Sequence, residues 1–396
     1  MTRFIDALLA DGRRVDLDVV DGVVVSIDAA AASTAAGDRA DTIDLHGRLL
    51  LPSLCDGHLH LDKTLMGLPW LPHAAEPFRM SRIETDKKIL PHLALSTEQR
   101  AINLVRRCVS FGTGYLRTHV DIDLESGLAK LEGVLAARDR CRDIARIEIV
   151  AFPQSGVMRR PGTLALMEQA IVLGADLVGG LDPSEIDRDP RGQLDGIFDI
   201  ANRHGRGVDI HLHEPGELGL FSVQEICDRS LALGMQGKVT ISHCFCLGDI
   251  RESKLRTTLE SMSRAGVMVV THGAANSGFP PVALLHEYGV NVFAGNDDIR
   301  DTWSPYGTGD MLERVAYIGW RADLRRDEAV EFAYALGSWH GATAMGIADY
   351  GIAVGHPANF FTIEAGSIAE AVAGHVRREQ VVWNGRLVAE QGQMVA

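Results

Sequence analysis

Several features that mark whole classes of protein are missing from this sequence. Its 39 Lys and Arg residues are outnumbered by 53 Asp and Glu residues, for a formal net charge of -14, and no basic block occurs. Because phosphate binding needs a cationic stripe, we expect no nucleic acid partner. No apolar run approaches the roughly 20 residues that cross a bilayer, and the stretch MTRFIDALLADGRR lacks the apolar core of a signal peptide. We therefore expect a cytoplasmic protein with no membrane partner.

Cysteine pairs of the metal-binding or redox kind are also missing. The six cysteines form no CxxC pair, which excludes the zinc deaminases built on HxE and PCxxC motifs. In a reducing compartment we expect six free thiols. Cys244 and Cys246 follow a candidate strand, and we interpret them as packing residues.

Both ends of the chain have the pattern of β structure. The dipeptides Asp21-Gly22 and Asn384-Gly385 each interrupt runs rich in β-branched residues, which is a strong signal for a two-residue hairpin turn. The Ala-rich segment 29–41 is weakly patterned and predicts a loop.

Between these ends, short apolar runs alternate with helical patterns. Eight runs predict strands: 49–58, 115–120, 147–152, 177–181, 208–213, 239–243, 267–271 and 290–295. The pattern of a helix from Thr97 to Ser110 follows a capping box at Ser96 and Gln99. Eight strands that alternate with helices predict a barrel, whose reactive face lies at the C-terminal ends of the strands.

We therefore predict an α/β protein whose main unit is a (β/α)8 TIM-type barrel over residues 51–347. A small β-sandwich domain would be built from residues 1–50 and 348–396. The alternative is a doubly wound parallel sheet, which would carry a Gly-rich turn after its first strand to bind a dinucleotide. That place is taken by His58 and His60.

These two histidines are the first candidate site. Side chains alternate along a strand, so His58 and His60 would point the same way, about 7 Å apart, and could bind one cation. Imidazole is the commonest ligand for zinc and similar metals. Taken alone the motif is weak, because such a pair at a strand end is often only two satisfied histidines.

Polar residues also end three other predicted strands. They are His211 and His213 after the fifth strand, His243 after the sixth, and Asp297 with Asp298 after the eighth. Each has an ordinary alternative as a helix cap, a solvated turn or a core histidine. Three imidazoles and one carboxylate drawn from separate strand ends nevertheless suit a borderline divalent ion such as zinc or Fe(II).

Nearly the whole chain resembles members of the amidohydrolase superfamily and, within it, of the cytosine deaminase branch. The matching motifs are His58-Leu59-His60-Leu61-Asp62-Lys63, Arg117-Thr118-His119-Val120-Asp121, Val150-Ala151-Phe152-Pro153-Gln154, His211 through Glu214, Ser242-His243, and Asp297-Asp298 followed by Trp303, Pro305 and Gly307. Other stretches resemble the N-isopropylammelide aminohydrolases, which are triazine-degrading relatives: 62–63, 154–156, 177–183 and 298–301.

The resemblance implies one divalent metal per chain, zinc or Fe(II), bound by His58, His60, His211 and Asp297. Binuclear relatives use a carboxylated lysine from the fourth strand, and 177–183 contains no lysine. One metal is therefore expected.

The resemblance also implies the catalytic groups. Glu214 would carry a proton to a ring nitrogen, and His243 would orient the attacking hydroxide. Asp297 would take the proton of the attacking water and pass it to the leaving amine.

For the substrate side, the resemblance and the residue types agree on a small heterocycle. The Gln154 amide gives and takes a hydrogen bond at once, which matches a cis-lactam edge such as that of cytosine. Asp298 and Trp303 would line the pocket. The sequence thus predicts a hydrolytic deaminase that acts on cytosine or a cytosine-like pyrimidine and releases ammonia.

Three alternatives stay open. An N-alkyl ammelide is the second substrate candidate. A cyclic-amide hydrolase would use the same nucleophile, but its usual binuclear site needs the missing lysine. A barrel that has lost catalysis and serves as a binding protein is opposed by the intact ligand set. The sequence leaves the oligomeric state open, a homo-oligomer included.

Overall fold

The computed structural model describes residues 1–30, 41–73, 76, 78–275 and 277–395. Eight parallel strands form the central sheet in chain order: β6 (Leu54–Leu59), β7 (Thr113–Asp121), β8 (Arg146–Phe152), β9 (Leu177–Leu181), β10 (Gly207–Leu212), β11 (Val239–His243), β12 (Val267–Thr271) and β13 (Val292–Ala294). A parallel bridge from Leu59 to Asp297 brings the last strand back to the first. The predicted (β/α)8 barrel is thus confirmed, and it is nearly closed.

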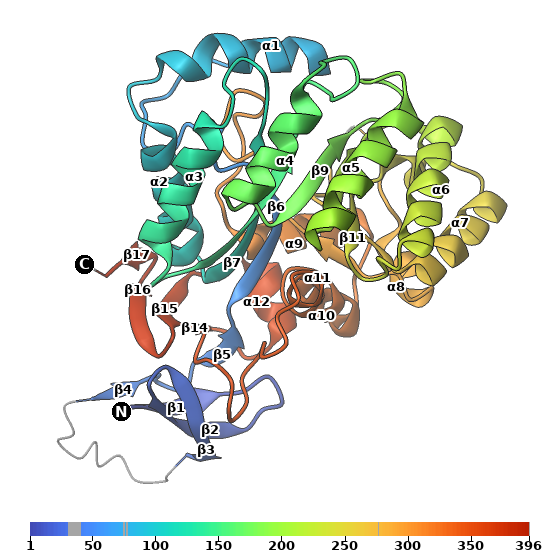
Figure 1. Cartoon of the computed structure of the whole chain (residues 1–396). Coiled ribbons are helices and arrows are strands. Elements are labelled where there is room, and N and C mark those ends of the chain that lie inside the picture. The colour runs from blue at the N-terminus through green and yellow to red at the C-terminus, as the bar shows by residue number, and fades with distance from the viewer. Residues whose placement is uncertain (31–40, 74–75, 77, 276, 396) are drawn as a thin grey trace.

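Helices connect the strands and cover the outside of the barrel (Figure 1). They are α2 (Thr97–Ser110), α3 (Ala129–Cys141), α4 (Thr163–Leu173), α5 (Pro190–His204), α6 (Gly216–Ala232), α7 (Glu252–Ala265), α8 (Val282–Glu287), α9 (Met311–Arg321), α10 (Asp327–Leu336) and α11 (Trp339–Ala344). The predicted capping box is present at the start of α2, because Ser96 Oγ accepts from Gln99 N at 3.2 Å and Gln99 Oε1 accepts from Ser96 N at 3.0 Å. Of the helices in the described part of the chain, none has the length and apolar character needed to cross a membrane.

A second, mostly antiparallel sheet of nine strands is built from both ends of the chain. Its N-terminal strands are β1 (Thr2–Leu8), β2 (Arg14–Val20), β3 (Val23–Ala29), β4 (Thr42–Asp44) and β5 (Leu49–Pro52), and its C-terminal strands are β14 (Phe360–Ile363), β15 (Arg378–Trp383), β16 (Arg386–Glu390) and β17 (Gln393–Met394). Both predicted hairpins are present, since Val20 pairs with Val23 and Trp383 pairs with Arg386. Most of the loop predicted for 29–41 lies outside the described residues.

The single first strand predicted for 49–58 is wrong, because the chain changes sheets within it. β5 pairs with β14 in the small sheet, whereas β6 begins at Leu54 and pairs with β7 in the barrel. Pro52 has no N–H to donate to a continuing ladder. Two residues later, Leu54 N donates to Gly112 O at 2.8 Å and joins the barrel.

The small sheet packs against the start of the second barrel strand. A Cβ on Gly112 would lie 2.7 Å from Phe361 Cδ1, and one on Gly114 would lie 2.1 Å from Trp383 Cζ3, so glycine is required where β14 and β15 approach. In Figure 1, β1 to β3 lie at the bottom of the view and helix α1 (Arg79–Ile89) at the top. The small sheet therefore lies at the end of the barrel opposite the C-terminal ends of its strands.

The cysteines behave as the sequence predicted. All six are free and buried, among them Cys244 and Cys246, which lie in the main hydrophobic core.

Candidate metal centre and substrate cavity

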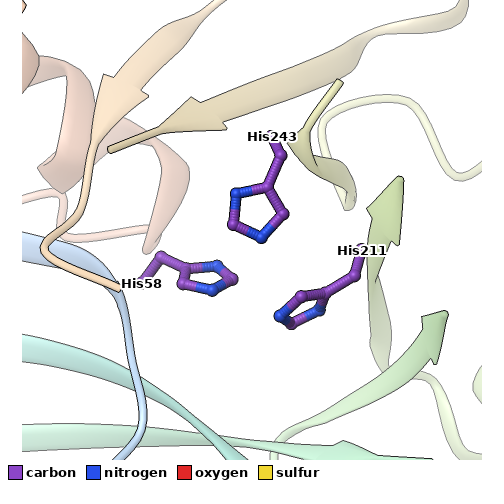
Figure 2. Close-up of side chains that lie close together, drawn as sticks. All are labelled: His58, His211 and His243. Carbon is purple, nitrogen blue, oxygen red and sulfur yellow. The ribbon is translucent and has the colours of Figure 1, made fainter. Parts of the chain in front are cut away.

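The C-terminal ends of the barrel strands bring a cluster of imidazoles together. Figure 2 shows the rings of His58, His211 and His243 turned toward a common centre. Their centroids lie 4.6 to 5.0 Å apart. His60 lies just beyond β6, with its ring centroid 5.6 Å from that of His211, and His119 of β7 lies 4.1 Å from His58.

A single carboxylate lies at the edge of this cluster. Asp297 Oδ1 lies 3.3 Å from His58 Nε2 and 3.4 Å from His60 Nε2, and its Oδ2 lies 3.3 Å from His272 Nδ1. The backbone of Asp297 has a φ of 63°, which is uncommon for a residue other than glycine. Its N–H donates to His58 O at 2.7 Å, so the contact with β6 holds the carboxylate over the histidines.

The imidazole nitrogens lack the partners that buried polar atoms normally have. His58 Nε2, His60 Nδ1 and both ring nitrogens of His119 and His211 are buried without a hydrogen bond. Burial lowers the pKa of His60 to about 4 and that of His211 well below its ordinary value, so both rings are neutral. Neutral imidazole is the form that binds a metal. This donor set therefore fits a zinc or Fe(II) ion.

Buried partners fix the orientation of His58. Its Nδ1 lies 2.9 Å from Ser242 Oγ, which donates to Asp209 Oδ1 at 2.6 Å, and Arg117 Nη1 donates to Asp209 Oδ2 at 3.1 Å. Because the Ser242 proton goes to Asp209, Nδ1 of His58 carries the hydrogen and Nε2 keeps its lone pair for a cation. Such outer partners set both the tautomer and the angle of a ligating histidine.

The structure brings together all four predicted ligands. Among the described residues, four overlapping groups could hold an ion: His58 with His211 and His243; His58 with His119 and Asp209; His58 with His60 and Asp297; and His243 with His272 and Asp297. His119 and His272 had no predicted role. His272 directly follows β12, so the strand-end argument that identified His243 would also have identified it.

A cavity of about 240 Å³ opens beside the imidazole cluster. Its lining includes all three predicted substrate-binding residues, Gln154, Asp298 and Trp303, together with Lys63 and Arg82. Three of the four predicted metal ligands, His60, His211 and Asp297, thus line the cavity, and we call them the metal-binding wall. Groups able to hold a planar heterocycle form the second wall.

Gln154 and Lys63 are paired with each other on that second wall. Gln154 Oε1 accepts a hydrogen bond from Lys63, and its Nε2 donates to Asp86 Oδ2 at 3.1 Å. Lys63 Nζ also lies 3.1 Å from Asp121 Oδ1. Burial alone would lower the pKa of Lys63, but the Asp121 and Asp86 carboxylates raise it above its ordinary value, so the amine stays charged. Gln154 keeps one N–H and one acceptor position for a ligand.

The predicted proton carrier Glu214 is not among the described residues that line the cavity. Its Oε1 accepts from the backbone N–H groups of Ser184 and Glu185 at 2.6 and 2.9 Å, and its Oε2 accepts from Ser222 Oγ at 2.5 Å. These three hydrogen bonds hold the Glu214 carboxylate in its place outside the cavity lining.

His213 lines the cavity instead. Its Nδ1 lies 2.8 Å from Asp182 Oδ2, and its ring stacks on that of His243 with centroids 4.5 Å apart. The bond to Asp182 leaves Nε2 for the cavity. His213 was predicted only as a polar residue at a strand end, although the alternation of side chains that pairs His58 with His60 also places His213 on the side of His211.

Comparison with known proteins agrees with this geometry. The amidohydrolase family matches residues 72–389. N-isopropylammelide isopropyl amidohydrolase of Pseudomonas sp. (strain ADP) is 30% identical over 390 residues, which cover 96% of this chain and 95% of that protein.

Two of the solved structures that cover the whole chain are those of an aminohydrolase and a deaminase. N-isopropylammelide isopropylaminohydrolase from Burkholderia multivorans ATCC 17616 is 40% identical, with a TM-score of 0.94 and 100% of both chains covered. 5-Methylcytosine deaminase from Klebsiella pneumoniae, liganded with phosphonocytosine, is 27% identical, with a TM-score of 0.88 and the same coverage. The protein therefore belongs to the amidohydrolase family, as its motifs predicted.

Proposed function

We propose that this protein is a metal-dependent hydrolase that removes an exocyclic amino or alkylamino group from a small N-heterocycle. The observation that carries the proposal is the cavity itself, whose lining combines the unpartnered imidazole nitrogens of His60 and His211 with the Gln154 amide. His58, His60, His211 and Asp297 would hold one zinc or Fe(II) ion. Such an ion supplies a strong oxygen nucleophile at neutral pH, because it lowers the pKa of water from about 16 to about 7.

The reaction adds water to the ring carbon that carries the amino group. The C–N bond then breaks, the ring carbon becomes a carbonyl, and the nitrogen leaves as ammonia or an alkylamine after it gains a proton. Asp297 would accept a proton from water and deliver it to that nitrogen. His243 lies with its Nδ1 4.0 Å from Asp297 Oδ2, where it would orient the water oxygen.

A second proton is needed at the ring nitrogen. Glu214 stays a candidate for this step only if its carboxylate leaves the Ser184 and Glu185 amides. His213 needs no such movement, since Asp182 already directs its Nε2 into the cavity. We therefore assign the proton transfer to His213, with Glu214 as a support for the strand end. General acid-base catalysis of this kind typically contributes about 100- to 10,000-fold.

The substrate that the site supports best is an N-alkyl ammelide, a triazine ring with two carbonyls and one alkylamino group. The Burkholderia relative that is 40% identical over the whole chain acts on such a compound by its name. Lys63 adds cationic N–H donors beside Gln154, and a ring rich in carbonyls has acceptors for both.

Cytosine or a 5-substituted cytosine is the second candidate. The amide of Gln154 keeps one donor and one acceptor for a carbonyl beside a ring N–H, and the Klebsiella 5-methylcytosine deaminase shares the fold over its full length. Phosphorylated nucleotides should be poor substrates, because the cavity is only about 240 Å³ in volume.

The test is a release assay with metal-loaded protein. Ammonia and alkylamine would be measured with ammelide, N-alkyl ammelides, cytosine, 5-methylcytosine, isocytosine and creatinine as substrates, and chromatography would detect any ring-opened product. Amine release from an N-alkyl ammelide is expected. Ring opening without amine release, or a nucleoside monophosphate that exceeds every free base, would overturn the proposal.

A further inference from the structure

We infer that Asp86 of α1 is a positioning residue that fixes the order of donor and acceptor on the substrate-recognising wall of the cavity. The inference rests on the proposed function. Asp86 is 1% exposed and is not among the described residues that line the cavity beside the imidazole cluster. It would therefore act through the residues that it holds.

One carboxylate binds both predicted substrate-binding residues that carry an N–H. Asp86 Oδ2 accepts from Gln154 Nε2 at 3.1 Å and from Trp303 Nε1 at 2.7 Å, and Oδ1 accepts from Thr302 Oγ1. Gln154 follows β8, and Trp303 lies in the segment after β13. Asp86 thus ties two distant parts of the chain to helix α1.

The partners of Gln154 determine which way its amide faces. The carboxylate of Asp86 lies on the nitrogen side, and the ammonium of Lys63 lies on the oxygen side. A flipped amide would set an oxygen against a carboxylate and an NH₂ group against an ammonium. Both contacts would be repulsive, so the free N–H and the free lone pair of Gln154 meet the ligand in one fixed order. A lactam edge with the matching order would be preferred over its mirror arrangement.

The same carboxylate sets the plane of Trp303. Its indole N–H is bound to Asp86, and the Lys63 amine lies 5.1 Å from its ring centroid. An indole face held in this way offers a stacking surface for a planar heterocycle. Loss of the Asp86 charge should therefore weaken substrate binding while the metal-binding wall stays intact.

The first test is the variant Asp86→Asn, which keeps the shape and removes the charge. We expect a rise in KM of roughly 10- to 100-fold, because hydrogen bonds to a charged group are stronger than neutral ones, with kcat within a few-fold of the parent and metal content unchanged. The preference between isomeric heterocycles with opposite lactam order should fall in parallel. Asp16→Asn is a matched control, because the buried Asp16 of β2 accepts from Asp6 N at 2.9 Å and Arg3 Nη2 at 3.1 Å in the small sheet. It should lower thermal stability and leave KM unchanged.

The second test does not depend on activity. The chain has five tryptophans, and Trp303→Phe would assign the Trp303 indole signal in a ¹H–¹⁵N correlation spectrum of the metal-loaded protein. In Asp86→Asn this signal should move upfield and exchange faster with solvent, while the other four stay in place. Trp303→Phe removes the same bond from its other end and should raise KM in the same direction, which keeps the inference testable if Asp86→Asn fails to fold.

The possible outcomes distinguish a failure of the role of Asp86 from a failure of the proposed hydrolase function. An unmoved indole signal, or a moved signal with unchanged KM and unchanged isomer preference, would overturn the role of Asp86. A moved signal in a protein that releases no amine from any heterocycle would instead overturn the proposed function and leave the Asp86 contacts standing. In a Gln154→Ala, Trp303→Phe background, Asp86→Asn should add less than 2-fold to KM; a full additional effect would mean that Asp86 acts by another route.

Discussion

The two walls of the cavity differ in how far their polar atoms are satisfied. On the metal-binding wall, His60 and His211 have buried ring nitrogens without partners. On the wall next to α1, the Gln154 amide and the Trp303 indole already have partners. An unsatisfied buried polar group costs about 1 to 3 kcal/mol, and a cation bound to the first wall would remove this cost. The second wall is ordered before any ligand binds. Substitutions on the first wall should therefore change metal content and rate, whereas substitutions on the second should change KM.

The sharpest test of this difference is His211→Ala. We expect the variant to lose most of its metal and to lower kcat/KM by at least about 1,000-fold, because the nucleophile depends on the ion. Elemental analysis of parent and variant gives the first number, and one metal per parent chain is expected. Full metal retention in the variant, or two metals in the parent, would contradict the ligand set.

Next in size is the effect of the proton carrier. His213→Asn should keep the metal and lower kcat by roughly 100-fold or more, whereas Glu214→Gln should have a smaller effect, since Gln retains an oxygen for the Ser184 and Glu185 amides. Rates and metal content would be measured for both. If Glu214→Gln is the more damaged of the two, the carboxylate moves into the cavity during turnover and the sequence-based assignment of Glu214 is the better one.

A smaller effect is expected from the support of His58. Ser242→Ala removes the hydrogen-bond acceptor for Nδ1, and changes of this kind typically cost about 10- to 100-fold in metal affinity. Competition with a chelator measures this affinity directly. Ser230→Ala is a suitable control, because the buried Ser230 Oγ donates to Ala265 O outside the site. Equal affinities in Ser242→Ala and the parent would show that packing alone orients His58.

The smallest of these effects belongs to the ordered wall. Gln154→Ala should raise KM for the best heterocycle by about 10-fold, since one partner of the lactam edge is lost, and should leave the metal content at the parent value. Steady-state kinetics on metal-loaded protein would decide this. An unchanged KM and kcat would show that Gln154 does not touch the substrate. The second wall would then have no demonstrated role in substrate binding.

Much of the metal-binding wall could be predicted from the sequence because strand geometry places its residues. Side chains at the ends of parallel strands meet at one face, so His58, His211 and His243 followed from their positions alone. The same rule applied to His272 would have added it. Asp182 holds the ring of His213 at the cavity, and the amides of Ser184 and Glu185 hold the carboxylate of Glu214 away from it. These partners lie 29 to 31 positions earlier in the chain, and no local pattern reports them.

The wall next to α1 was harder to predict for the same reason. Asp86 lies in the connection between β6 and β7, and its partners Gln154 and Trp303 are 68 and 217 positions away. Nothing in the spacing of these residues brings them together. The change of sheets at Pro52 was also missed, because both sides of it read as one apolar run.

The direct connection from β5 to β6 should make the two strands unfold together. Only Ser53 separates the two strands, so β5, which is paired to β14 near the C-terminus, leads directly into the strand that carries His58. Hydrogen exchange should then find the amides of Leu51 and Cys55 in a single cooperative unit. A chain shortened before β14 would leave β5 with β1 as its remaining neighbour in the sheet and should, through β5, loosen His58, although the deleted residues lie at the far end of the barrel.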